Sequence, residues 1–503
     1  MSRREERRRQ RLRERNALQA QVSQLVNKVP KYELLSPEGL ERVHQVSMRI
    51  LAEMGIEFMD DETLSILRTG GAEVEGQLVR FPPGMIEELV AKAPSQFTQL
   101  ARNPERNVVV GGDHIIFAPV YGPPFIYERE RGRRDATLQD FQDFVKLAYR
   151  SDRIHHSGGT IVEPVDVPVP VRHLDMLYSH IRYSDKPFMG SVTSAENAAD
   201  SVHMAEIVFG AKAIWENPAL LSLINVNSPR RYDDRMLGAL KVYARARQAV
   251  IITPFILAGA MSPVSLAGTL AQQNAEALAG IALTQLINPG MPVVYGSFLT
   301  NIDLQSGSPS FGTPESALGL FVSAQLARRY HLPFRGGGAF TSSKLPDAQA
   351  AYESAMTLWP TVMANTNFVL HAAGWLDGGL AASFEKFVLD TELLGMMRVW
   401  MNGIELSDES FALDALEEVG PGGHYLGAAH TMRHFRTAFY RPILFENASF
   451  EEWEAAGQED AYTRATRLWK HMLATYERPL LDEGIDEALQ DFIARRKTAL
   501  SKR

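Results

Sequence analysis

The chain has 503 residues, of which 45% are hydrophobic and 22% charged, and it contains 37 Gly, 27 Pro and no Cys. This composition is typical of a globular protein and excludes the disordered and fibrous classes. Without a thiol the chain cannot form disulfides, zinc-thiolate sites or iron–sulfur sites, and it cannot use a Cys nucleophile. The formal net charge of −8 offers no general attraction for nucleic acid or for an anionic membrane.

The N-terminal segment, residues 1–31, is the exception to this charge balance. Its first 15 residues contain eight Arg and three Glu, which give a local charge of +5. No aromatic residue lies between these arginines to stack on bases, so we expect a solvated helix or tail, and nucleic-acid binding is not favoured. No apolar stretch of the kind found in secretory signals follows, and we therefore expect a cytoplasmic protein.

Residues 32–106 are expected to form a small helical region. Apolar residues recur at helical spacing from Leu40 to Leu51, and Ser36, Pro37 and Glu38 form a plausible helix start.

From residue 107 to residue 401, short apolar runs alternate eight times with longer helical patterns. This order predicts an α/β protein, a (β/α)8 TIM barrel, with residues 402–503 as a C-terminal extension packed on it. A doubly wound open sheet is the rival fold, but its glycine-rich phosphate turn is missing from the first βα connection. The predicted strands are 114–120, 155–162, 188–192, 221–226, 249–256, 292–298, 332–337 and 368–372. The predicted helices are 137–150, 171–184, 195–209, 232–245, 266–286, 314–330, 347–364 and 380–401.

The stretch from Ala249 to Ala271 is apolar enough to be considered as a membrane span. Pro and Gly interrupt it, and Ser and Thr are scattered through it. A strand that is covered on both faces, followed by a buried helix, explains the pattern better, so no membrane segment is expected.

The residues at the carboxyl ends of the predicted strands are candidates for a site, because barrels of this type place their chemistry there. Aromatic side chains predominate, and such a mouth suits a small organic cation. Each ring could instead be part of the core, and His371 could be a hydrogen-bonded core histidine. Glu163 lies between a predicted buried strand and Pro164, where a carboxylate has to be paired or functional. The candidates are Tyr121, Glu163, Tyr295, Phe298, Arg335, Phe340, His371 and Trp375.

The sequence gives little support for a metal site or for a catalytic nucleophile. The 13 His show no His-Glu-x-x-His pattern, and no Gly-x-Ser-x-Gly motif occurs. The nearest cluster is His424, His430 and His434, of which the last two share a helix face if that segment is helical. We expect no metal site.

Several ordered motifs carry a family resemblance from about Tyr32 onward. The segment from Tyr295 to Asp303, Phe311-Gly-Thr-Pro-Glu, the segment from Pro346 to Glu353, and His371-Ala-Ala-Gly-Trp-Leu resemble the trimethylamine methyltransferase family. The C-terminal Gly420-Pro-Gly-Gly-His-Tyr-Leu and the segment from His430 to Arg436 are also similar to that family.

The resemblance implies a TIM barrel that transfers a methyl group from an amine to the Co(I) corrinoid (cobalamin) of a separate corrinoid-binding protein, with no cofactor bound tightly by the barrel itself. The trimethylamine enzymes use pyrrolysine, whereas this chain has only ordinary residues from Arg335 to Pro346, where that position is expected. Members without pyrrolysine resemble quaternary amine demethylases, with glycine betaine as the best known substrate. A tertiary methylamine substrate and a non-catalytic betaine-binding barrel remain alternatives.

A quaternary ammonium can leave as a neutral amine, so the barrel has to hold the cation, orient one methyl and exclude water. We expect Tyr121, Phe298, Phe340 and Trp375 to act as rings around the cation. Arg335, His371 and Gln349 are available to a substrate carboxylate. No general base is needed, and we expect the protein to form a homo-oligomer.

Overall fold

The computed structural model describes residues 24–501, and its largest sheet has parallel strands at its centre. Six of these strands follow one another as hydrogen-bonded parallel neighbours in the order β7-β17-β16-β13-β12-β10. They are β7 (His114–Phe117), β17 (Phe368–Val369), β16 (Phe334–Arg335), β13 (Val293–Gly296), β12 (Ala249–Ala258) and β10 (Leu221–Val226). Each falls within two residues of a predicted strand start, so the mixed α/β class is confirmed.

The predictions of regular strands at 155–162 and 188–192 are wrong. The second segment keeps a single parallel bridge, from Phe188 to Leu220. In the first segment, Gly158 has a φ of +92°, which interrupts an extended backbone. Both segments still bond to their neighbours, because His155 N donates to Phe117 O at 2.9 Å and Met189 N donates to Gly158 O at 2.9 Å.

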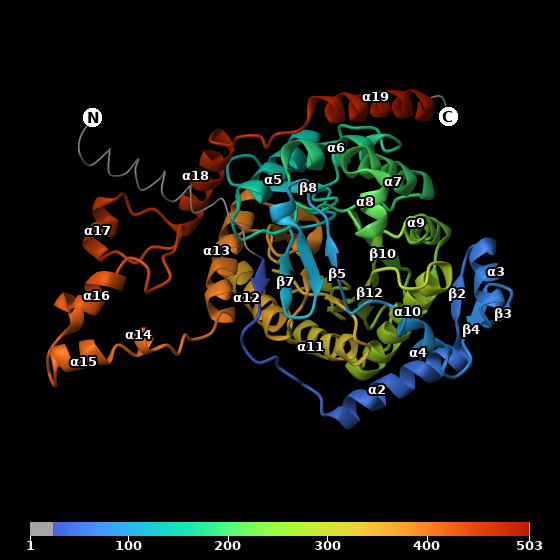
Figure 1. Ribbon diagram of the computed structural model, residues 1–503, viewed down its shortest axis with the longest axis horizontal. Coiled ribbons are helices and arrows are strands. Elements are labelled where there is room, and N and C mark those ends of the chain that lie inside the picture. The colour runs from blue at the N-terminus through green and yellow to red at the C-terminus, as the bar shows by residue number, and fades with distance from the viewer. Residues whose placement is uncertain (1–23, 502–503) are drawn as a thin grey trace.

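A helix follows each of the eight predicted strand positions, and these helices surround the sheet (Figure 1). Their starts agree with local capping signals. For example, Thr137 and Asp140 form a capping box at the first of them, and the Ser383 side chain caps the last. The helices are α5 (Leu138–Arg150), α6 (Arg172–Tyr183), α7 (Ala195–Phe209), α9 (Asp234–Arg245), α10 (Leu266–Ile287), α11 (Pro314–Arg329), α12 (Ala348–Met363) and α13 (Phe384–Met401).

The apolar stretch that resembled a membrane span is β12 followed by the start of α10. Residues Thr269 to Gln285 of α10 are all buried, because β12 lies on one side of this helix and α2, α4, α9 and α11 cover others. Among the described residues, no helix is both long and apolar enough to cross a membrane.

The side chains of the central strands alternate between two environments. Leu223, Ile251, Val294 and Leu370 belong to one cluster inside the curled sheet, whereas Tyr295 and Phe334 point to the layer between sheet and helices. The alternation of a β-strand then directs Arg335 to the inside. This parity decides which residues can reach a site at the carboxyl ends of the strands.

Short strands continue beyond the central ones and bring further loops to the carboxyl ends. A small sheet has the order β18-β19-β8-β9, and β14 and β15 extend the main sheet next to β12. Their bounds are β8 (Phe125–Glu128), β9 (Gly132–Asp135), β18 (Trp375–Leu376), β19 (Ala381–Ala382), β14 (Phe298–Ile302) and β15 (Pro309–Ser310); the short helix α8 (Ala211–Glu216) precedes β10.

The N-terminal region packs against the outside of α10 and α11. Its first helix, α2, begins after Ser36, whose side chain accepts a hydrogen bond from Gly39 N, as the sequence predicted. The arginine-rich stretch from residue 3 to residue 15 lies outside the described residues. The elements are β1 (Leu25–Val26), α2 (Pro37–Arg49), β2 (Ile56–Phe58), α3 (Asp61–Thr69), β3 (Glu73–Glu75), β4 (Leu78–Arg80), α4 (Met85–Val90), β5 (Gln96–Gln99) and β6 (Val108–Gly111), and β11 (Arg231–Tyr232) joins their sheet.

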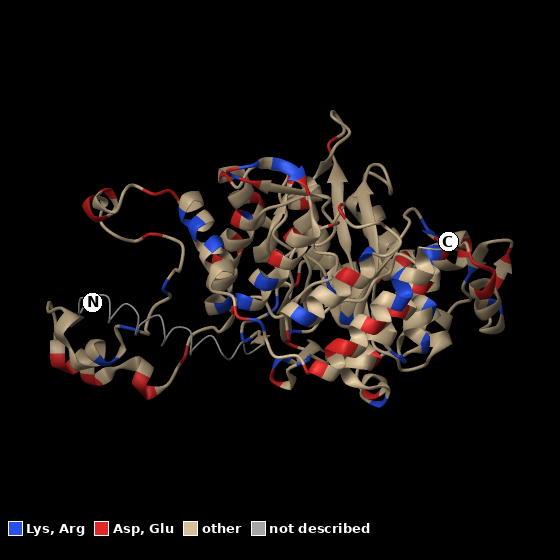
Figure 2. Cartoon of the chain, turned by 90° about the horizontal axis from the view of Figure 1, so that it is seen from above, with Lys and Arg blue, Asp and Glu red and all other residues tan. Residues whose placement is uncertain are grey.

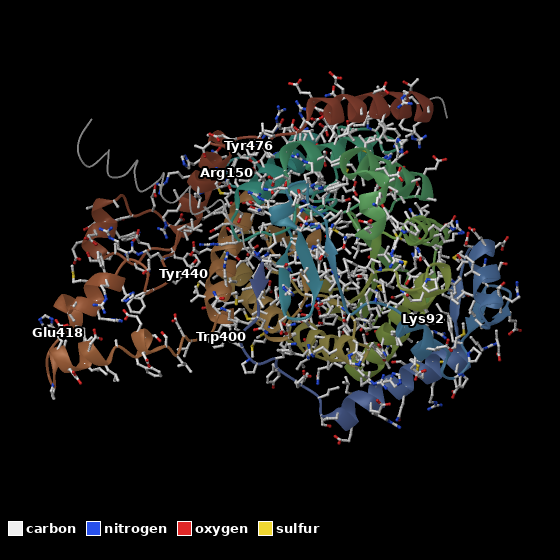
Figure 3. The ribbon with its side chains drawn as sticks, viewed as in Figure 1. Lys92, Arg150, Trp400, Glu418, Tyr440 and Tyr476 are labelled. Carbon is white, nitrogen blue, oxygen red and sulfur yellow. The ribbon has the colours of Figure 1, made fainter. Side chains whose placement is uncertain are left out.

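After α13 the chain leaves the body and forms a projecting segment, residues 402–460, which Figures 1 and 2 both show to one side of the molecule. The segment returns at Tyr440, whose side chain reaches toward the body in Figure 3 and donates a hydrogen bond to the Glu392 carboxylate of α13. Ile443 N and Leu444 N donate to the same carboxylate, each at 2.9 Å. Its helices are α14 (Asp408–Phe411), α15 (Leu413–Val419), α16 (Ala429–His434) and α17 (Phe450–Ala455).

The chain ends in two helices that pack back on the body, α18 (Ala461–Ala474) and α19 (Glu483–Leu500). Helix α19 lies across α6 and α7 (Figure 1). Ion pairs join it to them: Lys497 Nζ lies 2.6 Å from Asp175 Oδ1, and Arg496 Nε lies 2.7 Å from Asp200 Oδ1. Leu500, the last residue of α19, lines a pocket in the body of the protein.

Candidate functional site

Aromatic rings converge at the carboxyl ends of β12, β13, β16 and β17. Phe298 lies in the middle, with its ring centroid 5.2 Å from that of Phe340 and 5.4 Å from that of His371. Trp375 closes the group, with centroid distances of 4.8 Å to His371 and 5.1 Å to Phe340. We call this group the aromatic cluster; its members are Phe255, Phe298, Phe311, Phe340, His371 and Trp375, with Tyr121 at its edge.

Trp375 is held both at its edge and on one face. Trp375 Nε1 donates to Thr341 O at 3.1 Å, which fixes the indole plane. A side chain at Gly379 would lie 2.4 Å from Trp375 Cη2, so the backbone packs directly on this ring. Tyr121, Phe255 and Phe298 are only half-buried and mark the open side of the cluster, whereas Phe340 and Trp375 are buried.

His371 is held as a neutral ring. Its Nδ1 accepts a hydrogen bond from Tyr121 N at 3.2 Å, so the neutral imidazole carries its proton on Nε2 and can donate there. Burial, and secondarily the charge of Arg335, hold the pKa of His371 well below its ordinary value. Its φ is +68°, a strained conformation for a residue with a side chain. A Cβ at Gly338 would lie 2.9 Å from His371 O, so glycine is required beside it.

Arg335 is a buried cation next to the cluster. Its side chain is 1% exposed, its Nη1 donates to Ser297 O at 3.1 Å, and its Cζ lies 5.3 Å from the Phe298 ring centroid. Its Nε is buried without a partner, and among residues 24–501 no carboxylate forms an ion pair with it. Burial lowers the pKa of the Arg335 guanidinium from 12.5 to about 9, so it stays charged at neutral pH. Such a group is suited to receive an anion from outside.

Space next to Arg335 depends on a glycine. Gly296 is the register neighbour of Arg335, and a Cβ there would lie 2.0 Å from Thr253 Oγ1. Thr253 Oγ1 is itself buried without a hydrogen-bond partner. The interior below the aromatic cluster therefore holds a cation and a hydroxyl, both short of partners within the described chain.

Five of the predicted site residues come together here: Phe298, Arg335, Phe340, His371 and Trp375, with Tyr121 beside them. Tyr295 does not, because strand parity turns it outward, where its hydroxyl donates to Asn274 Oδ1 at 2.9 Å. Gln349 is exposed at the start of α12 and donates to Glu353 Oε1 at 2.9 Å.

Glu163 lies at a separate pocket of about 400 Å³ between α6 and the start of α7. Its carboxylate is 2.9 Å from Arg172 Nη1, so its charge is paired. Gly159 lines this pocket, and a Cβ there would lie 2.9 Å from Tyr121 Cε2, so the pocket lies directly behind the Tyr121 ring. No member of the aromatic cluster lines the pocket. Glu163 therefore does not take part in the cluster.

Phe255 and Phe311 belong to the cluster but were not among the predicted site residues. Phe255 stands at the end of a predicted strand, two residues after Thr253, and its parity would have placed it inside. Phe311 comes from the loop after β15, and its ring lies 5.1 Å from that of Trp375. Nothing in the local pattern around Phe311 signals that contact.

The family model described as "Trimethylamine methyltransferase (MTTB)" matches residues 2–501. The chain belongs to the trimethylamine methyltransferase family. It is therefore a methyltransferase, as the sequence motifs implied.

Relatives within the family differ in what their names say they act on. The chain is 50% identical over 469 residues to a glycine betaine methyltransferase from Desulfitobacterium hafniense, which covers 93% of this chain and 98% of the relative. It is 31% identical to a proline betaine:corrinoid methyltransferase from Eubacterium limosum, with 91% and 96% covered. A trimethylamine methyltransferase from D. hafniense is 29% identical, with 91% and 92% covered.

Proposed function

We propose that this methyltransferase removes a methyl group from a quaternary amine that carries a carboxylate, with glycine betaine as the first candidate, and passes it to the Co(I) of a separate corrinoid protein. The names of the more similar relatives support a betaine over trimethylamine. The observation that carries the proposal is Arg335, a buried guanidinium without a carboxylate partner in residues 24–501, next to an aromatic cluster. A cation cage beside a fixed positive charge matches a zwitterion.

The proposed roles follow from the contacts. The rings of Phe298, Phe340 and Trp375, with Tyr121 at the open side, hold the ammonium group by cation–π attraction. Arg335 binds the carboxylate, and His371 donates to it from Nε2. Tyr295 and Gln349, which were candidates from the sequence, have no role in this proposal, because both already have hydrogen-bond partners away from the cluster.

The residues fit a reaction in which the protein moves no proton. The substrate is already positively charged and leaves as a neutral amine, and His371 is neutral, so no acid or base near the cluster has to change its state. The rings exclude water from the ammonium group and leave its methyl groups free to turn toward the half-buried side at Tyr121, Phe255 and Phe298. The corrinoid, when its carrier protein docks, supplies the Co(I) nucleophile that accepts the methyl group.

We infer that residues 107–401 close into a (β/α)8 barrel. The hydrogen bonds of the two irregular segments support this: the first bonds to β7 through Phe117, and the second bonds to the first through Gly158. The parallel bridge from Phe188 to Leu220 then leads to β10, at the other end of the strand order. In this interpretation the irregular segments take the second and third strand positions.

The test is turnover with a defined partner. Purified protein is mixed with the reduced cognate corrinoid protein and glycine betaine, proline betaine, carnitine, choline or trimethylamine. We expect a betaine to change the corrinoid absorbance and to yield the demethylated amine in equal amount. Tight betaine binding without any demethylated product would indicate a binding barrel, and product from trimethylamine alone would refute the role of Arg335.

A further inference from the structure

The projecting segment lacks an apolar core of its own. Between residues 402 and 443, the only buried hydrophobic side chains are Ala415 and Ala428. Large side chains on the same stretch are exposed, for example Leu413 at 67% and Phe439 at 85%. Short helices that bury so little surface need another source of stability, such as a partner or a metal.

Three potential metal ligands meet in this segment, from two helices that are distant in sequence. Glu409 lies on α14, and His430 and His434 lie on the same face of α16, four residues apart. One donor atom of each lies within 4.8 Å of the other two. Both imidazoles direct Nε2 at Glu409: His434 reaches its Oε1 at 2.9 Å, and His430 reaches its backbone oxygen at 3.2 Å. His424 is not part of this group.

Two imidazoles and one carboxylate form a ligand set that suits zinc. Tetrahedral zinc with bonds of about 2.0–2.1 Å holds its ligand atoms about 3.3 Å apart. Here His434 Nε2 lies 2.9 Å from Glu409 Oε1, and the three donor atoms all lie within 4.8 Å of one another. Rotation about side-chain bonds of Glu409, which is exposed, and of the two half-buried histidines can adjust these separations to about 3.3 Å. Zinc takes nitrogen and oxygen ligands, whereas magnesium and calcium prefer oxygen alone.

The neighbouring charges allow this arrangement. Arg433 Nη2 lies 3.3 Å from Glu409 Oε1 and 3.5 Å from Asp414 Oδ2. Asp414 can therefore still pair with Arg433 when the Glu409 carboxylate binds a metal. Helix α15 already contacts α16, because Glu418 Oε2 accepts a hydrogen bond from Ala429 N at 3.2 Å. Figure 3 shows Glu418 at the far side of the projecting segment.

We propose that Glu409, His430 and His434 bind one zinc ion, with water as the fourth ligand, and that the ion joins α14 to α16. The site belongs to the projecting segment and is independent of the methyl transfer proposed above. Its role is to hold together short helices that apolar packing does not hold. This inference replaces the expectation from sequence that the chain has no metal site.

The test is a zinc titration of the untagged full-length protein after removal of metal with a chelator. We expect calorimetry with zinc chloride to show one ion per chain, and magnesium chloride to show no binding. His434→Gln and Glu409→Gln should each weaken zinc binding about tenfold or more, since even loss of a partner behind a ligand costs about 10–100-fold. His203→Gln is the matched control: His203 Nδ1 lies 3.4 Å from Glu206 on an exposed helix face, without a third ligand, and its zinc affinity should be unchanged.

Hydrogen exchange gives a second measurement that does not depend on the variants. Zinc should slow amide exchange in residues 408–434 of the wild-type protein and leave exchange in α19 unchanged. Absence of a zinc heat above that of magnesium, or equal zinc affinity in Glu409→Gln and the control, would overturn the proposal. Because neither measurement uses the corrinoid protein, failure here is distinguishable from failure of the proposed methyl transfer.

Discussion

Replacement of Arg335 by Met should stabilise the protein and impair its reaction at the same time. In the absence of substrate the guanidinium is buried without a carboxylate partner in the described chain, so its charge opposes folding. With a betaine bound, the same charge would be paired with the substrate carboxylate. Methionine has a similar length and flexibility but no charge, and it can fill the space beside Phe298.

The magnitudes follow from the pKa and from the hydrogen bond to be lost. A pKa lowered from 12.5 to about 9, at about 1.36 kcal/mol per unit, corresponds to about 5 kcal/mol of unfavourable burial. At pH 7 both folded and unfolded chains hold this proton, so the full cost applies, and it is relieved only as the pH rises above 9. After packing losses we expect a gain of about 1–4 kcal/mol in the free energy of unfolding. Loss of a charged hydrogen bond, about 1.5–3 kcal/mol, should lower kcat/KM for glycine betaine about 10- to 150-fold.

Two measurements check the prediction. Urea unfolding gives the change in stability, and calorimetry compares binding of glycine betaine with binding of tetramethylammonium, which has no carboxylate. The variant should lose affinity for the betaine only. Arg495→Met, at an exposed pair with Asp491, should change neither quantity. A less stable Arg335→Met protein, or equal losses for both ligands, would refute the reasoning.

Three further predictions concern the cluster and the core. Phe298→Leu should lower kcat/KM for glycine betaine about 5- to 30-fold in the corrinoid assay, because a desolvated cation–π contact is worth about 1–2 kcal/mol; an unchanged value would place the cation elsewhere. Burial lowers the pKa of His180 to about 4, so between pH 6.5 and 4 only the unfolded chain takes up its proton and stability falls as the pH falls. The free energy of unfolding of His180→Gln, measured with urea, should therefore fall by about 1.4 kcal/mol less per pH unit below 6.5 than that of the wild type. An equal dependence of the two unfolding free energies on pH would contradict the lowered pKa. Asp390→Asn should cost about 3–5 kcal/mol of unfolding free energy, because it leaves the Lys386 ammonium, which lies 2.5 Å from Asp390 Oδ1, buried and unpaired. Asp491→Asn, at an exposed pair, is the control and should cost roughly 1 kcal/mol or less; an equally small loss for Asp390→Asn would argue against a buried ion pair.

The order of elements could be predicted from the sequence because it depends on local patterns. Helix α7 has the predicted bounds, and α10 could be distinguished from a membrane span by the Pro and Gly in front of it. The irregular backbone at 155–162 and 188–192 could not be predicted, because the apolar, β-branched composition of both segments is that of strands. What interrupts the first of them is the left-handed backbone at Gly158, which a composition does not reveal.

The candidate site could be predicted in part. Strand-end position identified Phe298 and Arg335 correctly as neighbours, but it also selected Tyr295, because it ignored the alternation within the same strand. Gln349 was chosen within the predicted helix 347–364, but the sequence did not show that it lies on the exposed face of that helix. Glu163 lines a pocket behind Tyr121, where Gly159 packs on the Tyr121 ring, and no local signal in the sequence records this contact between segments.

The position of α19 has a practical consequence for handling the protein. Leu500, the last residue of α19, lines the pocket that contains Glu163. A peptide fused directly after α19 would begin beside that pocket and close to the ion pairs that hold α19 on α6 and α7. Assays of binding and turnover are therefore better made with protein from which any tag at this end of α19 has been removed.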